Sequence, residues 1–462
     1  MPEGTSKSRV GSLYLPGLIA LLLLRLVLSA WIYREPSKAY WLDSGEYDSL
    51  AMQFLRGAAY DGDAGDPVEL FRTPGYPALL ALIYGSVGRH YGNVALVQLI
   101  LGGASCLGLF SILRREAGPG AAFLLSGFYA LDPSSTFWAT TVMAETLFTF
   151  TVVAALYCLW RWWGGASWRW TLLGGVLAGL SALVRPIGTL LLPLWSGMVL
   201  LRAWKAGSEA DPSGSRSRSA MLKGGAAFLA AIALALAPYM FYNLRVWGVF
   251  TLSSVDTFNL GRYHAAPLLM ESEGIPLEQA LEELEVSYLP QPGARGRYWA
   301  VIGQAPLTYA KLFAAGDLVV LFWPEYHRWF GLFDISFHTR GALEQLLSGN
   351  IAEAVKRLAG YLGDEPLTGI ALAFSISYQL GMYGLALLGG ARTLRSGGLT
   401  PSGKLWVLLL VLTALVLLLT PGPVGEQRFR IPAQPALILL GASLASQRGR
   451  HREQSGPVGE FA

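Results

Sequence analysis

Three acidic residues lie close together in the segment that follows the first long apolar run. Asp43, Glu46 and Asp48 stand within the stretch WLDSGEYDSLA. A carboxylate held at a membrane surface can act as a general base, and a group of carboxylates can bind a divalent cation. The same spacing also describes a helix start, with Asp43 as the N-cap and Glu46 in the first turn. Both interpretations stay open, because a capping carboxylate is fixed in place and kept ionised.

Glu145 stands at the start of an otherwise apolar run, in the sequence MAETLF. A charged side chain inside the hydrocarbon costs about 2.5–3.5 kcal/mol at the bilayer centre and less near the interface. A carboxylate kept at that cost is a second candidate for catalysis. The alternative is a boundary residue that lies in water.

Arginines occur in turns that the topology described below places on the outer face. Arg185 lies in ALVRP, and Arg428 and Arg430 flank a phenylalanine in GEQRFRIP. Positive charge on that side runs against the general bias of membrane proteins, so it needs a local anion. That anion is either a carboxylate, such as Glu426, or a phosphate or pyrophosphate, which arginine binds through paired hydrogen bonds.

A mixture of polar and aromatic residues begins with NLRVWG at Asn243 and continues to His264. Such a mixture suits a carbohydrate, since sugar rings stack on aromatic side chains while amides bind hydroxyl groups. It equally suits an interfacial aromatic belt without a ligand. The sequence signatures of soluble nucleotide, metalloprotease and serine-hydrolase sites are missing, so nucleotide-dependent chemistry has no support.

The composition indicates what kind of chain positions these residues. Of the 462 residues, 53% are hydrophobic and 14% are charged, whereas soluble domains carry about 25% charged residues. This excludes a disordered chain, a coiled coil and an ordinary cytosolic enzyme. The net charge of +4 is too small to suggest a nucleic-acid partner. The two cysteines lie inside apolar runs and imply neither a disulfide framework nor a zinc site.

Apolar runs near 20 residues recur along the chain, which predicts an all-α polytopic membrane protein with about ten transmembrane helices. The candidate spans are 11–33, 93–113, 119–137, 143–162, 170–184, 187–203, 222–243, 366–390, 404–421 and 431–447. Segment 74–88 is too short to cross and carries two prolines near its start, so we expect it to be interfacial or re-entrant. The basic loops then fall on the cytoplasmic side, which places both termini there and the acidic loops outside.

This topology divides the chain into two transmembrane modules. The N-terminal module covers 1–203 and includes a first outer loop at 34–92. A cytoplasmic linker at 204–221 is rich in serine, glycine and charge. The C-terminal module covers 222–462 and includes an outer loop region at 243–365. Within that region, the apolar stretch 312–324 is short and is interrupted by Asp317, which leaves its entry into the membrane open.

Taken in order along the chain, six motifs resemble the GT-C fold glycosyltransferases. They are Asp43-x-x-Glu46-Tyr47, Arg72-Thr-Pro-Gly-Tyr76-Pro, Glu145-Thr-Leu-Phe, Leu-Val-Arg185-Pro, Asn243-x-Arg245-Val-Trp-Gly and Glu426-Gln-Arg428-Phe-Arg430-x-Pro. The chain is most similar to glycosyltransferase family 39, the bacterial branch related to protein O-mannosyltransferases and lipid A aminoarabinose transferases. The resemblance implies a GT-C type helical bundle with juxtamembrane helices and loops on its outer face.

The resemblance also implies an activity, namely sugar transfer from a polyprenyl-phosphate-linked donor at the extracytoplasmic face of the plasma (inner) membrane. It makes an acidic residue of the first outer loop the base, and the catalytic candidates are Asp43, Glu46 and Glu145. The residues assigned to the donor phosphate are Arg185, Arg428, Arg430 and Arg245. The candidates for lining the substrate are Tyr47, Arg72, Tyr76, Asn243, Asn259 and His264.

A carboxylate base opposite a departing phosphate implies direct displacement, with inversion at C1 of the sugar. The acceptor stays open between a glycan, a lipid and a protein; membrane lipids are further partners, and nucleic acid is not expected. No cofactor is required by these motifs, although the acids near Asp43 leave a divalent metal ion open. The alternative function is a membrane transporter or a flippase for lipid-linked sugars, whose charged residues would mark a path through the bilayer.

Overall fold

The computed structural model describes residues 4–41, 43–57, 68–205, 218–289, 291–323, 328–329, 345, 351–364, 366–395, 401–442 and 444. Every regular element within these ranges is a helix. The predicted all-α class is therefore confirmed for the described part of the chain.

Long apolar helices form the body of the molecule. The helices α1 (Gly4–Arg34), α5 (Tyr91–Ala117), α11 (Arg218–Trp247) and α20 (Pro366–Arg395) are each long and apolar enough to cross a membrane. A fifth span results if α15 (Ala294–Gln304) and α16 (Pro306–Phe322), which meet at a bend of 101°, are counted as one. The chain is thus a multi-pass membrane protein.

The helices α1, α5, α11 and α20 correspond to four of the predicted spans. Four more predicted spans also coincide with helices, but these four helices are shorter or less apolar than the first set. They are α8 (Glu145–Trp163), α9 (Arg169–Val184), α10 (Gly188–Lys205) and α21 (Pro401–Leu419). Helix α9 packs between α8 and α11, and α5 packs against α1, α6 and α8. Outward-facing leucines such as Leu234, which is 73% exposed, and Leu387, which is 72% exposed, suit contact with lipid and not with water.

Two predicted spans differ from single helices. Segment 119–137 forms α6 (Pro119–Ala130) and α7 (Pro133–Trp138), because Asp132 caps a new helix by accepting a hydrogen bond from the Ser135 amide at 2.6 Å and Pro133 opens it. Segment 431–447 begins inside a 3₁₀ helix, η4 (Gln427–Ala433), and continues as α22 (Gln434–Gly441). The expectation of one continuous helix in each segment was therefore wrong.

Segment 74–88 forms α4 (Gly75–Val87), a helix of 13 residues that packs mainly against α2 (Ser44–Arg56). A helix of this length rises about 20 Å, which is less than the hydrocarbon thickness of about 30 Å. The structure therefore agrees with a segment that does not cross on its own.

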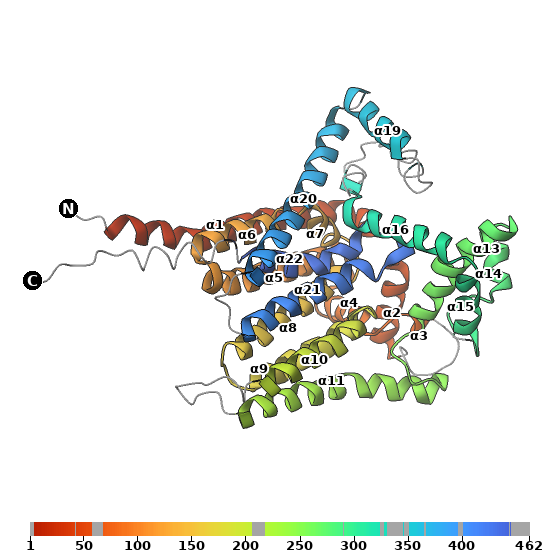
Figure 1. Cartoon of the computed structure of the whole chain (residues 1–462), viewed down its shortest axis with the longest axis horizontal. Coiled ribbons are helices and arrows are strands. Elements are labelled where there is room, and N and C mark those ends of the chain that lie inside the picture. The colour runs from red at the N-terminus through yellow and green to blue at the C-terminus, as the bar shows by residue number, and fades with distance from the viewer. Residues whose placement is uncertain are drawn as a thin grey trace, which may run out of the picture.

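The two ends of the bundle differ (Figure 1). The N-terminus of α1 lies at one end, whereas α2, α3 (Val68–Phe71), α13 (Ala266–Glu273) and α14 (Leu277–Glu283) lie at the other. The helices α13, α14 and α15 share a small hydrophobic core of their own, separate from that of the bundle. Helix α19 (Ile351–Asp364) projects sideways from the bundle.

A close backbone contact fixes the turn that precedes η4. Helix α16 packs against η3 (Gly422–Val424), and a Cβ atom at Gly316 would overlap the carbonyl group of Gly422. Gly425 then turns the chain with a φ of 57°, a conformation that favours glycine. This glycine-dependent packing sets the direction in which η4 enters the bundle.

Candidate active site

Asp43 lies at the start of α2, but its carboxylate does not cap the helix. It occupies the N-cap position without a side-chain capping hydrogen bond. The hydroxyl group of Ser44 stabilises this turn instead: it accepts from the Trp41 amide at 2.8 Å and donates to the Val142 carbonyl at 2.9 Å. The Asp43 carboxylate is therefore available for other contacts.

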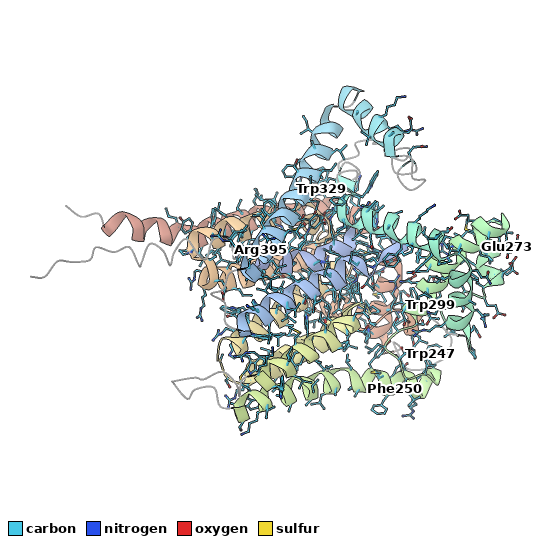
Figure 2. All side chains as sticks on the ribbon, in the orientation of Figure 1. Trp247, Phe250, Glu273, Trp299, Trp329 and Arg395 are labelled. Carbon is cyan, nitrogen blue, oxygen red and sulfur yellow. The ribbon has the colours of Figure 1, made fainter. Side chains whose placement is uncertain are left out.

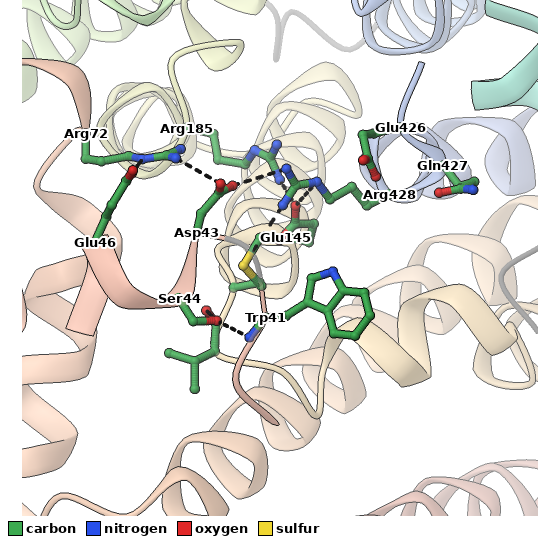
Figure 3. Close-up of polar contacts among 12 residues, drawn as sticks. Trp41, Asp43, Ser44, Glu46, Arg72, Glu145, Arg185, Glu426, Gln427 and Arg428 are labelled. Carbon is green, nitrogen blue, oxygen red and sulfur yellow. Dashed lines mark hydrogen bonds and ion pairs between the residues drawn. The ribbon is translucent and has the colours of Figure 1, made fainter. Parts of the chain in front are cut away.

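Two arginines from distant parts of the chain bind the two oxygens of Asp43 (Figure 3). Nη2 of Arg72 lies 3.0 Å from Oδ1, and Nη2 of Arg428 lies 3.1 Å from Oδ2. Arg72 also donates from Nε to Oε2 of Glu46 at 2.5 Å. Residues 43 and 428 are separated by 385 positions, so only the packed bundle brings them together.

Glu145 begins α8 and is fully buried on the other side of Arg428. Its Oε1 accepts a hydrogen bond from Nη1 of Arg185 and lies 3.5 Å from Nε of Arg428. Its other oxygen, Oε2, has no hydrogen-bond partner in the described part of the chain. Arg428 thus lies between two carboxylates, Asp43 and Glu145, with Arg185 beside it.

Aromatic rings hold the arginines in place. The Cζ atom of Arg428 lies 5.6 Å from the ring centroid of Trp138 and 5.3 Å from that of Phe429. Cζ of Arg185 lies 5.3 Å from the Phe429 ring as well. Such cation–π contacts orient a guanidinium without using its N–H groups, so those groups stay available for carboxylates or for a ligand.

A further arginine, Arg328, belongs to this group and was not among the sequence candidates. Its Nη2 lies 3.1 Å from Oε2 of Glu426 and donates to Oε1 of Gln427 at 3.2 Å. Its Cζ lies over the rings of Trp41 and Trp138. Neither Arg328 nor Trp138 stands in one of the six motifs, so no local pattern pointed to them.

Arg430 occupies a different environment from Arg428. Its guanidinium donates to the carbonyl groups of Val320 at 3.2 Å and Trp323 at 2.7 Å and to the Ser134 hydroxyl at 2.9 Å. In a 3₁₀ helix with three residues per turn, residues two apart point about 120° away from each other. The two arginines of η4 accordingly make different contacts, and those of Arg430 are to backbone carbonyl groups and a hydroxyl group.

Asp48, the third acidic residue of the stretch WLDSGEYDSLA, makes contacts outside this group. Asp48 accepts a hydrogen bond from the Tyr84 hydroxyl at 2.8 Å and pairs with Nη2 of Arg89 at 2.5 Å. Among the described residues, no cluster of three or more histidine, cysteine, aspartate or glutamate side chains could hold a metal ion. The carboxylates of Asp43 and Glu46 are instead bound to arginine.

The candidates for lining the substrate separate into two groups. Tyr47 lies under the Arg72 guanidinium at 5.1 Å and against the Tyr76 ring, whose hydroxyl donates to Gln98 at 2.9 Å. These residues adjoin the Asp43 site.

The other lining candidates have contacts outside the Asp43 site. The Asn243 amide donates to the Thr251 carbonyl at 2.7 Å, and Nδ1 of His264 lies 2.8 Å from the Tyr309 hydroxyl. Burial lowers the pKa of His264 to about 4, so this histidine is neutral at physiological pH. His264 lies in the π-helical turn η2 (Leu260–Ala265), and Asn259 directly precedes this turn. Arg245 is exposed near the end of α11.

The charges around Asp43 keep its carboxylate ionised. Burial by itself would raise the pKa of Asp43. The guanidinium groups of Arg72 and Arg428 lower this pKa by more than burial raises it, so the pKa lies below its usual value. The same contacts raise the pKa of Arg72 and of Arg428 although burial opposes this. Asp43 is consequently a carboxylate across the physiological pH range.

This pKa shift predicts how the stability of the protein depends on pH. A carboxyl whose pKa is lower in the folded than in the unfolded state stabilises the fold above the unfolded pKa of about 3.9, and this contribution is lost as the pH falls through the folded pKa. The difference in unfolding temperature between the native protein and Asp43→Asn is expected to stay constant from pH 7 to pH 5. Thermal unfolding in detergent measures it, and a difference that disappears near pH 6 would contradict the assignment.

Part of the chain that carries the site matches a known protein family. Residues 72–207 match the family model described as dolichyl-phosphate-mannose-protein mannosyltransferase. This range includes Arg72, Glu145 and Arg185. The resemblance seen in the motifs is confirmed over this range. No curated protein matches the chain.

Comparison with solved structures gives two further likenesses, both at low sequence identity. The Archaeoglobus fulgidus oligosaccharyltransferase in complex with Zn and sulfate is 12% identical with a TM-score of 0.49, and the match covers 94% of this chain and 50% of that one. ArnT from Cupriavidus metallidurans bound to undecaprenyl phosphate is 15% identical with a TM-score of 0.40, and the match covers 96% and 79%. The chain spans about half the length of the oligosaccharyltransferase.

Proposed function

We propose that the chain is an integral membrane glycosyltransferase that moves a sugar from a polyprenyl-phosphate-linked donor to an acceptor hydroxyl group. The observation that carries the proposal is the position of Arg428 between Asp43 and Glu145, with Arg185 beside it. A base and a set of guanidinium groups are the two parts that such a transfer requires. The description of the matched family, which names a mannose carried on dolichyl phosphate, supports the same donor class.

Asp43 acts as the general base in this proposal. The acceptor oxygen attacks C1 of the sugar and passes its proton to the carboxylate, while the bond between C1 and the phosphate oxygen breaks. The electron pair of that bond leaves with the polyprenyl phosphate. A positioned base contributes about 10²–10⁴-fold to such a step. Displacement by a single attacking oxygen inverts the anomeric centre.

Arg185 and Arg428 stabilise the charge that develops on the departing phosphate. Donors that are fixed before the reaction begins stabilise such charge without a reorganisation cost. Glu145 holds both arginines through Oε1, so its role here is to position them.

Donor binding and base strength are coupled through Arg428. A phosphate that attracts Arg428 away from Asp43 removes one of the three cations that lower the pKa of this carboxyl, the others being Arg72 and Arg185. Asp43 then becomes a stronger base only when the donor is in place.

The two ends of the bundle support an assignment of the site to one side of the membrane. The elements that carry the site, α2 and η4, lie away from the N-terminus of α1, and basic residues close the opposite helix ends, as at Arg114 and Arg115 of α5. The bias toward cytoplasmic lysine and arginine supports cytoplasmic termini and a site that faces outside. The plasma (inner) membrane is the location proposed for the protein.

Purified protein in detergent tests the function. Synthetic polyprenyl-phosphate sugars are supplied together with glycan, lipid or peptide acceptors, and the release of free polyprenyl phosphate is measured. Release that depends on an acceptor supports a transferase. Movement of intact lipid-linked sugar across liposomes without release would instead support the transporter or flippase alternative.

A further inference from the structure

Arg328 is a buried cation whose guanidinium is only partly hydrogen-bonded by the described residues. Only 7% of the residue is exposed, yet Nε and Nη1 have no hydrogen-bond partner in the described part of the chain. Nη2 alone is used, by Glu426 and Gln427. Buried polar groups normally find partners, and an unpaired one costs free energy. Two guanidinium nitrogens of a buried arginine without a hydrogen-bond partner among the described residues are thus an observation that needs a cause.

Arg430 shows how the same bundle treats a purely structural arginine. Its three hydrogen bonds use Nη1 and Nη2 and reach two carbonyl groups and a hydroxyl group. In the described part of the chain, Arg328 has no such backbone contacts. Its neighbour Trp329 is labelled in Figure 2, and the Trp329 indole donates to the Pro133 carbonyl of α7 at 3.1 Å. Trp329 is thus anchored, while Nε and Nη1 of Arg328 have no hydrogen-bond partner among the described residues.

Arg328 forms a position separate from the pair Arg185 and Arg428. Those two arginines share Oε1 of Glu145, whereas Arg328 has its own carboxylate in Glu426. Figure 3 shows Glu426 and Gln427 on the side of Arg428 that faces away from Asp43.

The two positions are nevertheless neighbours. They are linked by Trp138, whose ring centroid lies 4.7 Å from Cζ of Arg328 and 5.6 Å from Cζ of Arg428. Both guanidinium groups therefore lie against the same indole ring.

We propose that Arg328 forms a second anion position in the site, which takes a second negatively charged group next to the phosphate held by Arg185 and Arg428. The inference rests on the proposed function, since that function supplies the first phosphate. A guanidinium stacked on indole rings keeps its N–H groups free for paired hydrogen bonds to an oxyanion. The second group comes either from the carrier, as the second phosphate of a prenyl diphosphate, or from an anionic acceptor.

Binding measurements on the full chain in detergent test the proposal with three probes. Undecaprenyl monophosphate and undecaprenyl diphosphate are titrated separately, and inorganic phosphate is titrated into protein saturated with the monophosphate. If the carrier supplies the second group, the native protein binds the diphosphate about tenfold or more tightly than the monophosphate. If the acceptor supplies it, the protein loaded with monophosphate binds inorganic phosphate.

In either case, Arg328→Gln is expected to remove the second-anion effect and to leave monophosphate affinity within about threefold. The proposal is overturned if the variant weakens both lipids equally or changes none of the three titrations. Failure of the native protein to bind the monophosphate would instead count against the proposed function. Arg295→Gln serves as the matched control, because it removes an exposed arginine paired with Asp256 and should change no titration.

A second variant covers the case in which Arg328→Gln does not fold. Arg328→Lys keeps the charge but has a single ammonium group, so affinity for the second anion is expected to fall about threefold or more. An unchanged affinity in a folded lysine variant would overturn the proposal.

Discussion

Replacing Asp43 with asparagine is expected to lower sugar transfer by about 10²–10⁴-fold, since the amide cannot accept the acceptor proton. The fold should survive, because Arg72 keeps Glu46 and Arg428 keeps Glu145 as ionic partners. Release of polyprenyl phosphate in the presence of acceptor measures the loss, and thermal unfolding in detergent measures the fold.

Glu46→Gln provides the matched control for Asp43→Asn. It removes the same charge three residues further along and from the same partner, Arg72, but Glu46 does not contact Arg428 in the described structure. We expect its activity to stay within about tenfold of the native value, in the range left by a lost surface ion pair. Full activity of Asp43→Asn together with an inactive Glu46→Gln would move the base to Glu46.

Replacing Arg428 with glutamine is expected to lower transfer by about 10²–10³-fold, the range found when one donor to a developing oxyanion is removed. Arg428 is the residue that contacts both Asp43 and Glu145, so its loss affects the leaving group and the base together. The pKa of Asp43 should rise as well, because one of the three cations that lower it is gone. The acidic limb of the pH profile of the residual activity is therefore expected to lie at higher pH than in the native protein.

Arg430→Gln is the control, because it makes the same change two residues away. Its guanidinium binds Val320, Trp323 and Ser134, so the expected effect is a loss of about 2–5 kcal/mol in the free energy of unfolding. Activity per folded molecule should remain. If Arg430→Gln instead removed donor binding without lowering the unfolding temperature, Arg430 would belong to the phosphate site.

Much of the site can be traced to local patterns in the sequence. Asp43, Arg72, Glu145, Arg185 and Arg428 each lie at the edge of an apolar run, where a charge is costly enough to indicate a purpose. The structure brings these five residues together. The motif series could not show that Arg430 and Asp48 point away, because side-chain direction depends on local helix type and on partners such as Arg89.

Arg328 and Trp138 lie beyond what any short pattern predicts. Trp138 ends α7, a helix that exists because Asp132 and Pro133 interrupt an apolar run that looks continuous by hydropathy. Arg328 meets Glu426 across 98 residues of sequence.

The sequence by itself determined that the chain is helical, lies in a membrane and carries its unusual charges at helix ends, because hydropathy and charge are local properties of each segment. The tertiary structure alone decided which charges meet. Close contacts such as Gly316 against Gly422 set the direction of η4, and that direction determines whether Arg428 or Arg430 reaches Asp43. Pairing between residues hundreds of positions apart depends on how helices pack, and no periodicity within one helix encodes it.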